Sequence, residues 1–204
     1  MDNVTIETKT PGEGNYYAYF DIPPALNLDL EDLEKRYYRL SRQYHPDFFQ
    51  NWPEEEQQEA LEKSAALNKA YDTLRGSIRR IEYMMQLHGF ESETDKNAVA
   101  QELMMEIFEL QELLEEFQGA DEDEREILAT QIRTSVDEMK QRREEELDRL
   151  PVLCREFDSS QEQEKIPLLE KMRQTIDRSN YFRRIIENSE KTIAGEADSV
   201  GKQL

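Results

Sequence analysis

The chain is poor in the residues on which disulfide-bonded, zinc-binding and membrane-spanning proteins depend. Its 204 residues include one cysteine, Cys154, and two histidines. One cysteine excludes an intramolecular disulfide and a zinc site built on a Cys-x-x-Cys pair, and it fits a reducing compartment. No stretch approaches 18 apolar residues in a row, and the first twenty residues lack the basic and apolar regions of a signal peptide. We therefore expect a cytoplasmic protein without a membrane span.

Basic residues are also scarce relative to acidic ones. There are 26 lysines and arginines against 46 aspartates and glutamates, so the net charge is −20. Such a balance opposes binding to nucleic acid or to anionic membranes. Charged residues make up 35% of the chain, while glycine and proline number only seven each, which suits long solvated helices. We expect an all-α protein that binds other proteins, with no nucleic-acid or membrane partner.

The first ninety residues predict a short aromatic helix at "NYYAYF", followed by an antiparallel pair of longer helices. Asp29 can cap the first of the pair, whose apolar residues recur every three or four positions. Pro46 ends that helix. Its apolar stripe is Leu33, Tyr37, Leu40 and Tyr44, and its opposite, basic face is Lys35, Arg39 and Arg42.

The antiparallel partner and one further helix complete this half. "EEEQQEALEKSAALNKAYDTL" repeats apolar or small residues at the same three-and-four spacing, which predicts a long helix. "SIRRIEYMMQLHGF" predicts a helix with His88 in its last turn and Gly89 as a left-handed cap.

The second half predicts a bundle of three helices, after a polar link at "ESETDKN". Gly119 ends the first helix, Asp121 caps the second, Pro151 halts it, and Pro167 lies in the opening turn of the third. "VLCREFDSS" is compatible with one helical turn or an irregular connection. The expected helices cover about 98–118, 122–150 and 165–193, and we expect disordered tails at 1–14 and 194–204.

The tripeptide His45-Pro46-Asp47 admits four interpretations: a catalytic site, a metal site, a helix stop or a contact surface. A nucleophile activated by His45 has only Ser41 nearby, and no group that orients the histidine or forms an oxyanion hole. A metal site needs convergent ligands, whereas His45, His88 and Cys154 are far apart in the sequence. For an isolated tripeptide, a helix stop with an incidental histidine is the default interpretation.

The surroundings of the tripeptide favour a contact surface. The basic helix ending in "YYRLSRQYHPD", a loop, and a helix carrying "NKAYDTL" resemble the J-domain of DnaJ-type co-chaperones. The resemblance implies that this region docks on an Hsp70-class ATPase and stimulates it, so that the chain itself is no enzyme. The matching residues are Lys35, Arg36, Arg39, Arg42, His45, Pro46 and Asp47.

"RRIEYMMQLHGF" and "LMMEIFELQELLEE" extend the resemblance to HscB-type co-chaperones of iron-sulfur cluster assembly. In that family a J-domain, here 15–90, precedes a three-helix bundle, here 91–193. The resemblance implies an IscU-type scaffold as client and a chaperone of the HscA/DnaK class as second partner. We expect no cofactor and no metal in this chain. A J-protein with a different client is the alternative.

Helical periodicity predicts where a client would bind. Leu103, Leu110 and Leu114 belong to one core stripe with Ile107 and Phe117, and we expect Met104, Met105 and Phe108 to lie outside it, in solvent. An exposed apolar patch edged by glutamates is typical of a protein-binding surface, unless a neighbouring helix buries this second stripe. The family's client-binding positions coincide with Met104, Met105, Phe108, Glu109, Glu112, Glu116 and Phe182.

Overall fold

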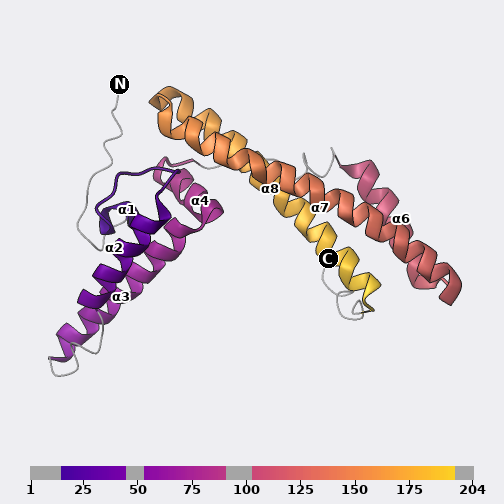
Figure 1. Cartoon of the computed structure of the whole chain (residues 1–204), viewed down its shortest axis with the longest axis horizontal. Helices are drawn as coiled ribbons and strands as arrows, with labels where there is room; N and C mark the ends of the chain where they lie inside the picture. Colours follow the sequence, from indigo (N-terminus) through magenta and orange to yellow (C-terminus); the bar gives the residue numbers. More distant parts are fainter. Residues whose placement is uncertain (1–14, 45–52, 91–102, 196–204) are drawn as a thin grey trace. The chain divides into compact units, whose positions relative to one another are not determined.

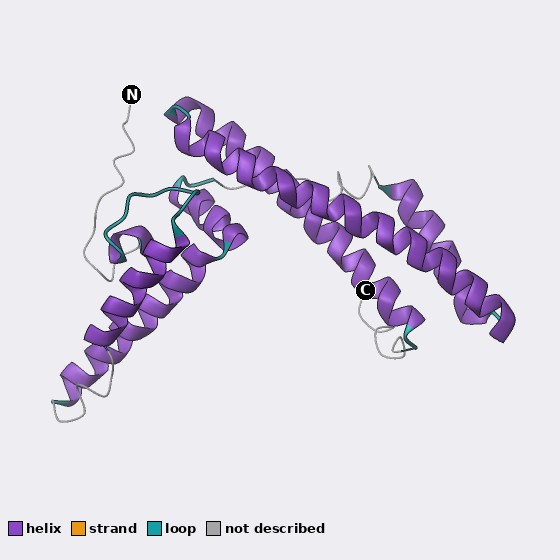
Figure 2. Cartoon of the chain, viewed as in Figure 1, coloured by secondary structure: helices purple, strands orange, loops and turns teal. Residues whose placement is uncertain are grey.

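The structure is a computed structural model that describes residues 15–44, 53–90 and 103–195. Every regular element within these ranges is an α-helix (Figure 2), so the predicted all-α class is confirmed. The chain divides into two compact units, one of residues 1–91 with 154–163 and one of 92–153 with 164–204. Residues 154–163, which we call the hairpin tip because one long helix ends there and the next begins, thus group with the first unit. The functional division into 15–90 and 91–193 stays a prediction.

The described residues between 15 and 90 form helices whose local signals the sequence carries. They are α1 (Tyr16–Tyr19), α2 (Leu30–Gln43), α3 (Glu54–Arg75) and α4 (Ser77–Leu87). The carboxylate of Asp29 accepts hydrogen bonds from the amides of Glu31 and Asp32 at 3.0 and 3.1 Å, so the predicted N-cap is confirmed. Gly89, just beyond α4, has a φ of +60°, a left-handed conformation that glycine adopts without strain.

Helices α2 and α3 form the predicted antiparallel pair and lie side by side (Figure 1). Tyr37 stacks on Tyr71 with ring centroids 4.1 Å apart, while Tyr44 lies farther along α2 and meets Lys63, earlier in α3. The residue numbers of the contacting pairs rise along α2 and fall along α3, so the two helices run antiparallel. Leu33 and Leu67 are almost fully buried, and they anchor the apolar stripes that the spacing predicts.

The loop before α2 is held by two charged residues from elsewhere in this unit. Arg80 of α4 is buried and donates hydrogen bonds to the carbonyls of Leu74 and Leu26. From the hairpin tip, the carboxylate of Asp158 accepts from the amides of Leu26 and Asn27 at 2.8 and 2.7 Å. Backbone groups that would otherwise lose their partners on folding are satisfied in this way, and the start of α2 is fixed.

The second unit is built mainly from α6 (Met104–Gly119), α7 (Glu122–Ser159) and α8 (Glu162–Ile193). The predicted cap is present, because the Asp121 carboxylate accepts from the Glu124 amide at 3.0 Å. The predicted stop at Pro151 is wrong, since α7 continues through it to Ser159. Pro167 is the sixth residue of α8 rather than part of its first turn.

Buried side chains explain why α7 continues past Pro151. Leu150, Cys154 and Phe157 are all buried at spacings of four and three, so the apolar stripe runs through the proline without interruption. Pro151 itself is exposed, and the carbonyl that loses its partner there can be hydrated. Burial of the stripe therefore outweighs the local cost of the proline.

The core of the second unit joins α6, α7 and α8. Leu110 and Leu114 of α6 pack in one cluster with residues of α7 and α8. The buried members are Leu103, Leu110, Leu114, Ile132, Val136, Met139, Phe182 and Ile186.

Candidate protein-binding surfaces

The basic face of α2 is present, and the fourth cation carried over from the family resemblance, Arg36, has a structural role instead. Lys35, Arg39 and Arg42 are exposed, as the helical period predicts. Arg36 instead forms an ion pair with Asp32 at 2.7 Å and donates to the backbone carbonyls of Phe20 and Asp21 at 2.8 and 3.1 Å. It ties α2 to the end of α1. The face available to a partner is therefore Lys35, Arg39 and Arg42.

The histidine-proline-aspartate tripeptide, residues 45–47, lies outside the described residues. Its predicted role as a contact surface stays a prediction. The structure describes the helix before it, which ends at Gln43, and the helix after the loop, which begins at Glu54.

The three apolar residues predicted to be exposed on α6 are exposed. Met104, Met105 and Phe108 have 56%, 74% and 60% of their surface in solvent. On the same helix Leu103, Leu110 and Leu114 are buried, and Ile107 and Phe117 pack partly buried against the core. No neighbouring helix among the described residues covers the second stripe. We call Met104, Met105 and Phe108 the α6 surface.

Charge borders the α6 surface, while the last predicted client residue lies elsewhere. Glu109, Glu112 and Glu116 are exposed on α6. Phe182 of α8, in contrast, is only 3% exposed and belongs to the core cluster. The guanidinium of Arg142 lies 5.2 Å from the centre of the Phe182 ring. Phe182 therefore supports the bundle from within and does not form part of the exposed surface.

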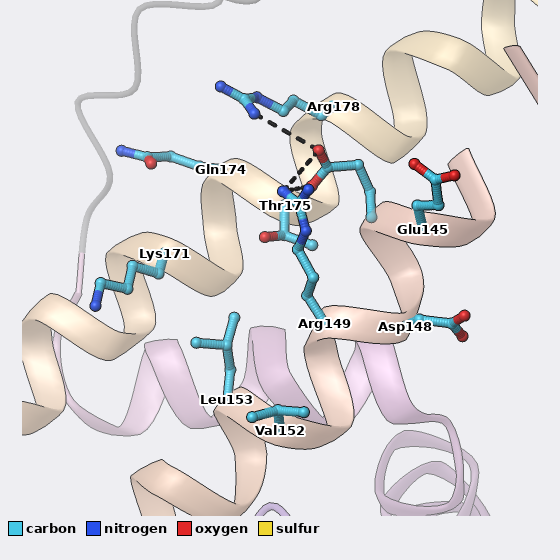
Figure 3. A pocket seen from close by; sticks show the side chains of 10 residues that line it. Glu145, Asp148, Arg149, Val152, Leu153, Lys171, Gln174, Thr175 and Arg178 are labelled. Atoms are coloured by element: carbon cyan, nitrogen blue, oxygen red, sulfur yellow. Dashed lines mark hydrogen bonds and ion pairs between the residues drawn. The ribbon is translucent and has the colours of Figure 1, made fainter. Parts of the chain in front are cut away.

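A groove of about 530 Å³ lies between α7 and α8, and Figure 3 shows the side chains that line it. Arg149 and Arg178 converge there on Glu146, with N–O distances of 2.9 and 3.5 Å. The Glu146 side chain is only 10% exposed, so the arginines compensate a carboxylate removed from water. Sequence reasoning missed this cluster, because Arg178 lies on a different helix, 32 positions after Glu146, and no local pattern joins the two residues.

Cys154 of the hairpin tip and Arg80 of α4 are both buried. Burial raises the pKa of the Cys154 thiol above its ordinary value, and the nearby Arg80 opposes that shift only in part. Burial likewise lowers the pKa of the Arg80 guanidinium. A buried thiol with a raised pKa holds little thiolate at neutral pH, and thiolate is the nucleophilic form.

Residues 15–44, 53–90 and 103–195 hold no group of three or more histidine, cysteine or carboxylate side chains arranged to bind a metal ion. Within the same ranges, no helix has the length and apolar character that crossing a membrane requires.

The arrangement of the first unit is that of a known domain, because residues 15–83 match the family model of the DnaJ domain. The chain is therefore a J-domain protein. Two solved structures are similar over both units. Chaperone HscB from Vibrio cholerae is 25% identical, with a TM-score of 0.53 over 85% of this chain and 98% of that one. The human co-chaperone protein HscB is also 25% identical with a TM-score of 0.53, over 93% of this chain and 85% of that one. The chain is a J-domain co-chaperone of the HscB type.

Proposed function

We propose that this protein binds an IscU-type scaffold of iron-sulfur cluster assembly and delivers it to a cytoplasmic chaperone of the HscA/DnaK class. The α6 surface and its bordering glutamates hold the scaffold. The basic face of α2 and the tripeptide at 45–47 dock on the chaperone and stimulate its ATP hydrolysis. The chemical step belongs to the chaperone, and this chain breaks no bond.

The observation that carries the proposal is the exposure of the α6 surface. A bundle helix normally turns its large apolar residues inward, as Leu110 does on this helix. Three large apolar side chains that remain in solvent on the other face form a patch of the kind that marks protein-binding sites. Methionine also adapts to irregular partner surfaces, because its side chain is unbranched and flexible.

The two proposed contact surfaces differ in charge. Lys35, Arg39 and Arg42 give α2 a basic face, although the whole chain carries a net charge of −20. Such a face accelerates encounter with an acidic partner. Glutamates border the α6 surface instead, which favours a partner of the opposite charge and disfavours the one that α2 attracts.

Calorimetric titration with an IscU-type scaffold tests the proposal. Replacing Met104, Met105 and Phe108 together by alanine should weaken binding at least a hundredfold, because buried anchors contribute about 1–2 kcal/mol each. Ile127→Ala is the matched control, since Ile127 is an apolar residue of α7 that is 63% exposed. It should leave affinity unchanged, and thermal melts of both variants should match the wild type.

Two outcomes would overturn the proposal. A wild-type chain that does not bind the scaffold would show that this J-protein serves a different client. Undiminished binding by the triple variant would show that the client site lies away from the α6 surface.

A further inference from the structure

A groove of about 310 Å³ runs between α6 and α7, beside the α6 surface. Its apolar lining comes from Leu110 and Leu113 of α6 and from Met139 of α7. The two helices lie next to each other in Figure 1. The polar residues that line the groove are Glu106, Glu109, Ser135, Glu138 and Arg142.

The groove has an excess of negative charge. Three carboxylates, from Glu106, Glu109 and Glu138, face one guanidinium, that of Arg142, which leaves a local charge of −2. Arg142 already has partners within the chain, because it forms an ion pair with Glu106 and lies over the ring of Phe182. Glu109 and Glu138 are exposed, and neither has a hydrogen bond or ion pair within the described residues. Their charges are available to a partner.

The groove is continuous with the α6 surface. At 100° per residue, Glu109 lies about 40° around the helix from Met105, on the side that faces the groove. Ser135, Glu138, Met139 and Arg142 follow one another at spacings of three, one and three, so they share one face of α7. A client seated on Met105 would therefore reach α7 without leaving the surface.

We propose that the scaffold-binding surface extends across this groove onto α7, and that the groove takes a lysine or arginine side chain of the scaffold between Glu109 and Glu138. The inference rests on the proposed function and adds a second helix and a charge requirement to it. The aliphatic stem of such a side chain packs along Leu113 and Met139, and its cation lies at the two carboxylates. Long basic side chains bind in this divided manner where an apolar floor ends in acidic groups.

A single α7 residue tests the inference, in titrations of the full-length chain with the IscU-type scaffold. Glu138→Gln should weaken binding about three- to fivefold, the range expected for a half-exposed ion pair, and Glu138→Lys should weaken it further. Glu138→Asp keeps the charge and should retain more affinity than Glu138→Gln. The difference between wild type and Glu138→Gln should shrink in 0.5 M salt, because the Debye length falls to about 4 Å there.

Glu144→Gln is the matched control, because Glu144 is an exposed carboxylate of the same helix that does not line the groove. It should bind as the wild type does, which separates a local contact from the loss of one negative charge. Thermal melts should be unchanged, since both glutamates are exposed.

Each further outcome has a definite meaning. Equal affinity of Glu138→Gln and Glu144→Gln, together with loss of binding in the triple α6 variant, would overturn the groove and leave the proposed function standing. A wild-type chain that does not bind the scaffold would overturn both.

Discussion

Helix α6 carries two sets of apolar residues that should respond oppositely to alanine. Leu110 is 2% exposed and packs in the core, whereas Phe108, two residues earlier, is 60% exposed. Leu110→Ala should therefore lower the free energy of unfolding of the second unit, while Phe108→Ala should leave it nearly unchanged. Both changes remove a large apolar side chain from one helix, so the comparison isolates the effect of burial.

The magnitudes follow from the two environments. Truncating a fully buried leucine removes its transfer free energy and leaves a cavity, which together cost about 2–5 kcal/mol. Because Leu110 meets residues from α7 and α8 in one cluster, little collapse into the vacated space is expected. A substitution at an exposed position such as Phe108 changes stability by about 0.5 kcal/mol or less.

Amide hydrogen exchange of α6 is the suitable assay, because it reports on the second unit even if the two units unfold separately. Protection should fall sharply in Leu110→Ala and stay at the wild-type level in Phe108→Ala. If Phe108→Ala lost as much protection as Leu110→Ala, the exposed residues would have to be part of a core, and the α6 surface could not be a docking site.

Two further predictions concern the first unit. Arg36→Ala should destabilise this unit by about 1–2 kcal/mol, because it removes an ion pair and two hydrogen bonds to the end of α1. Arg39→Ala should leave the thermal melt unchanged and slow association with the chaperone at low salt. Equal melting temperatures of the two variants, or a wild-type association rate in Arg39→Ala, would show that these roles are assigned wrongly. Iodoacetamide at pH 8 should modify Cys154 at least about a hundredfold more slowly in the native chain than in urea, because burial raises the pKa of the thiol and shields it from the reagent. Similar rates would mean that the thiol is exposed to solvent in the native chain.

Local signals predicted most of the helices, because helix termini depend on nearby residues. Asp29 and Asp121 cap helices in the structure as the sequence indicates, since a cap needs only a short acceptor side chain and the next few amides. The exposure of Met105 and the burial of Leu110 followed from helical period alone. Neither inference requires knowledge of the rest of the chain.

Features that depend on distant contacts were not predictable in this way. Arg36 lies on a basic helix, and only its hydrogen bonds to Phe20 and Asp21 show that it is structural. The hydrogen bonds that the Asp158 carboxylate accepts from the loop before α2 join residues more than 130 positions apart. Pro151 is a reliable helix stop only where no buried stripe crosses it, and Phe182 could be placed in the core only once α6 and α7 were in position around it.

The most direct test of a two-surface adaptor is single-turnover ATP hydrolysis by a DnaK-class chaperone in the presence of this chain. Wild type should stimulate hydrolysis, His45→Gln should leave it at the basal rate, and the triple alanine variant of the α6 surface should stimulate as strongly as wild type. Such a result would separate chaperone triggering from client capture. Full stimulation by His45→Gln, or loss of stimulation in a correctly folded triple variant, would contradict the account.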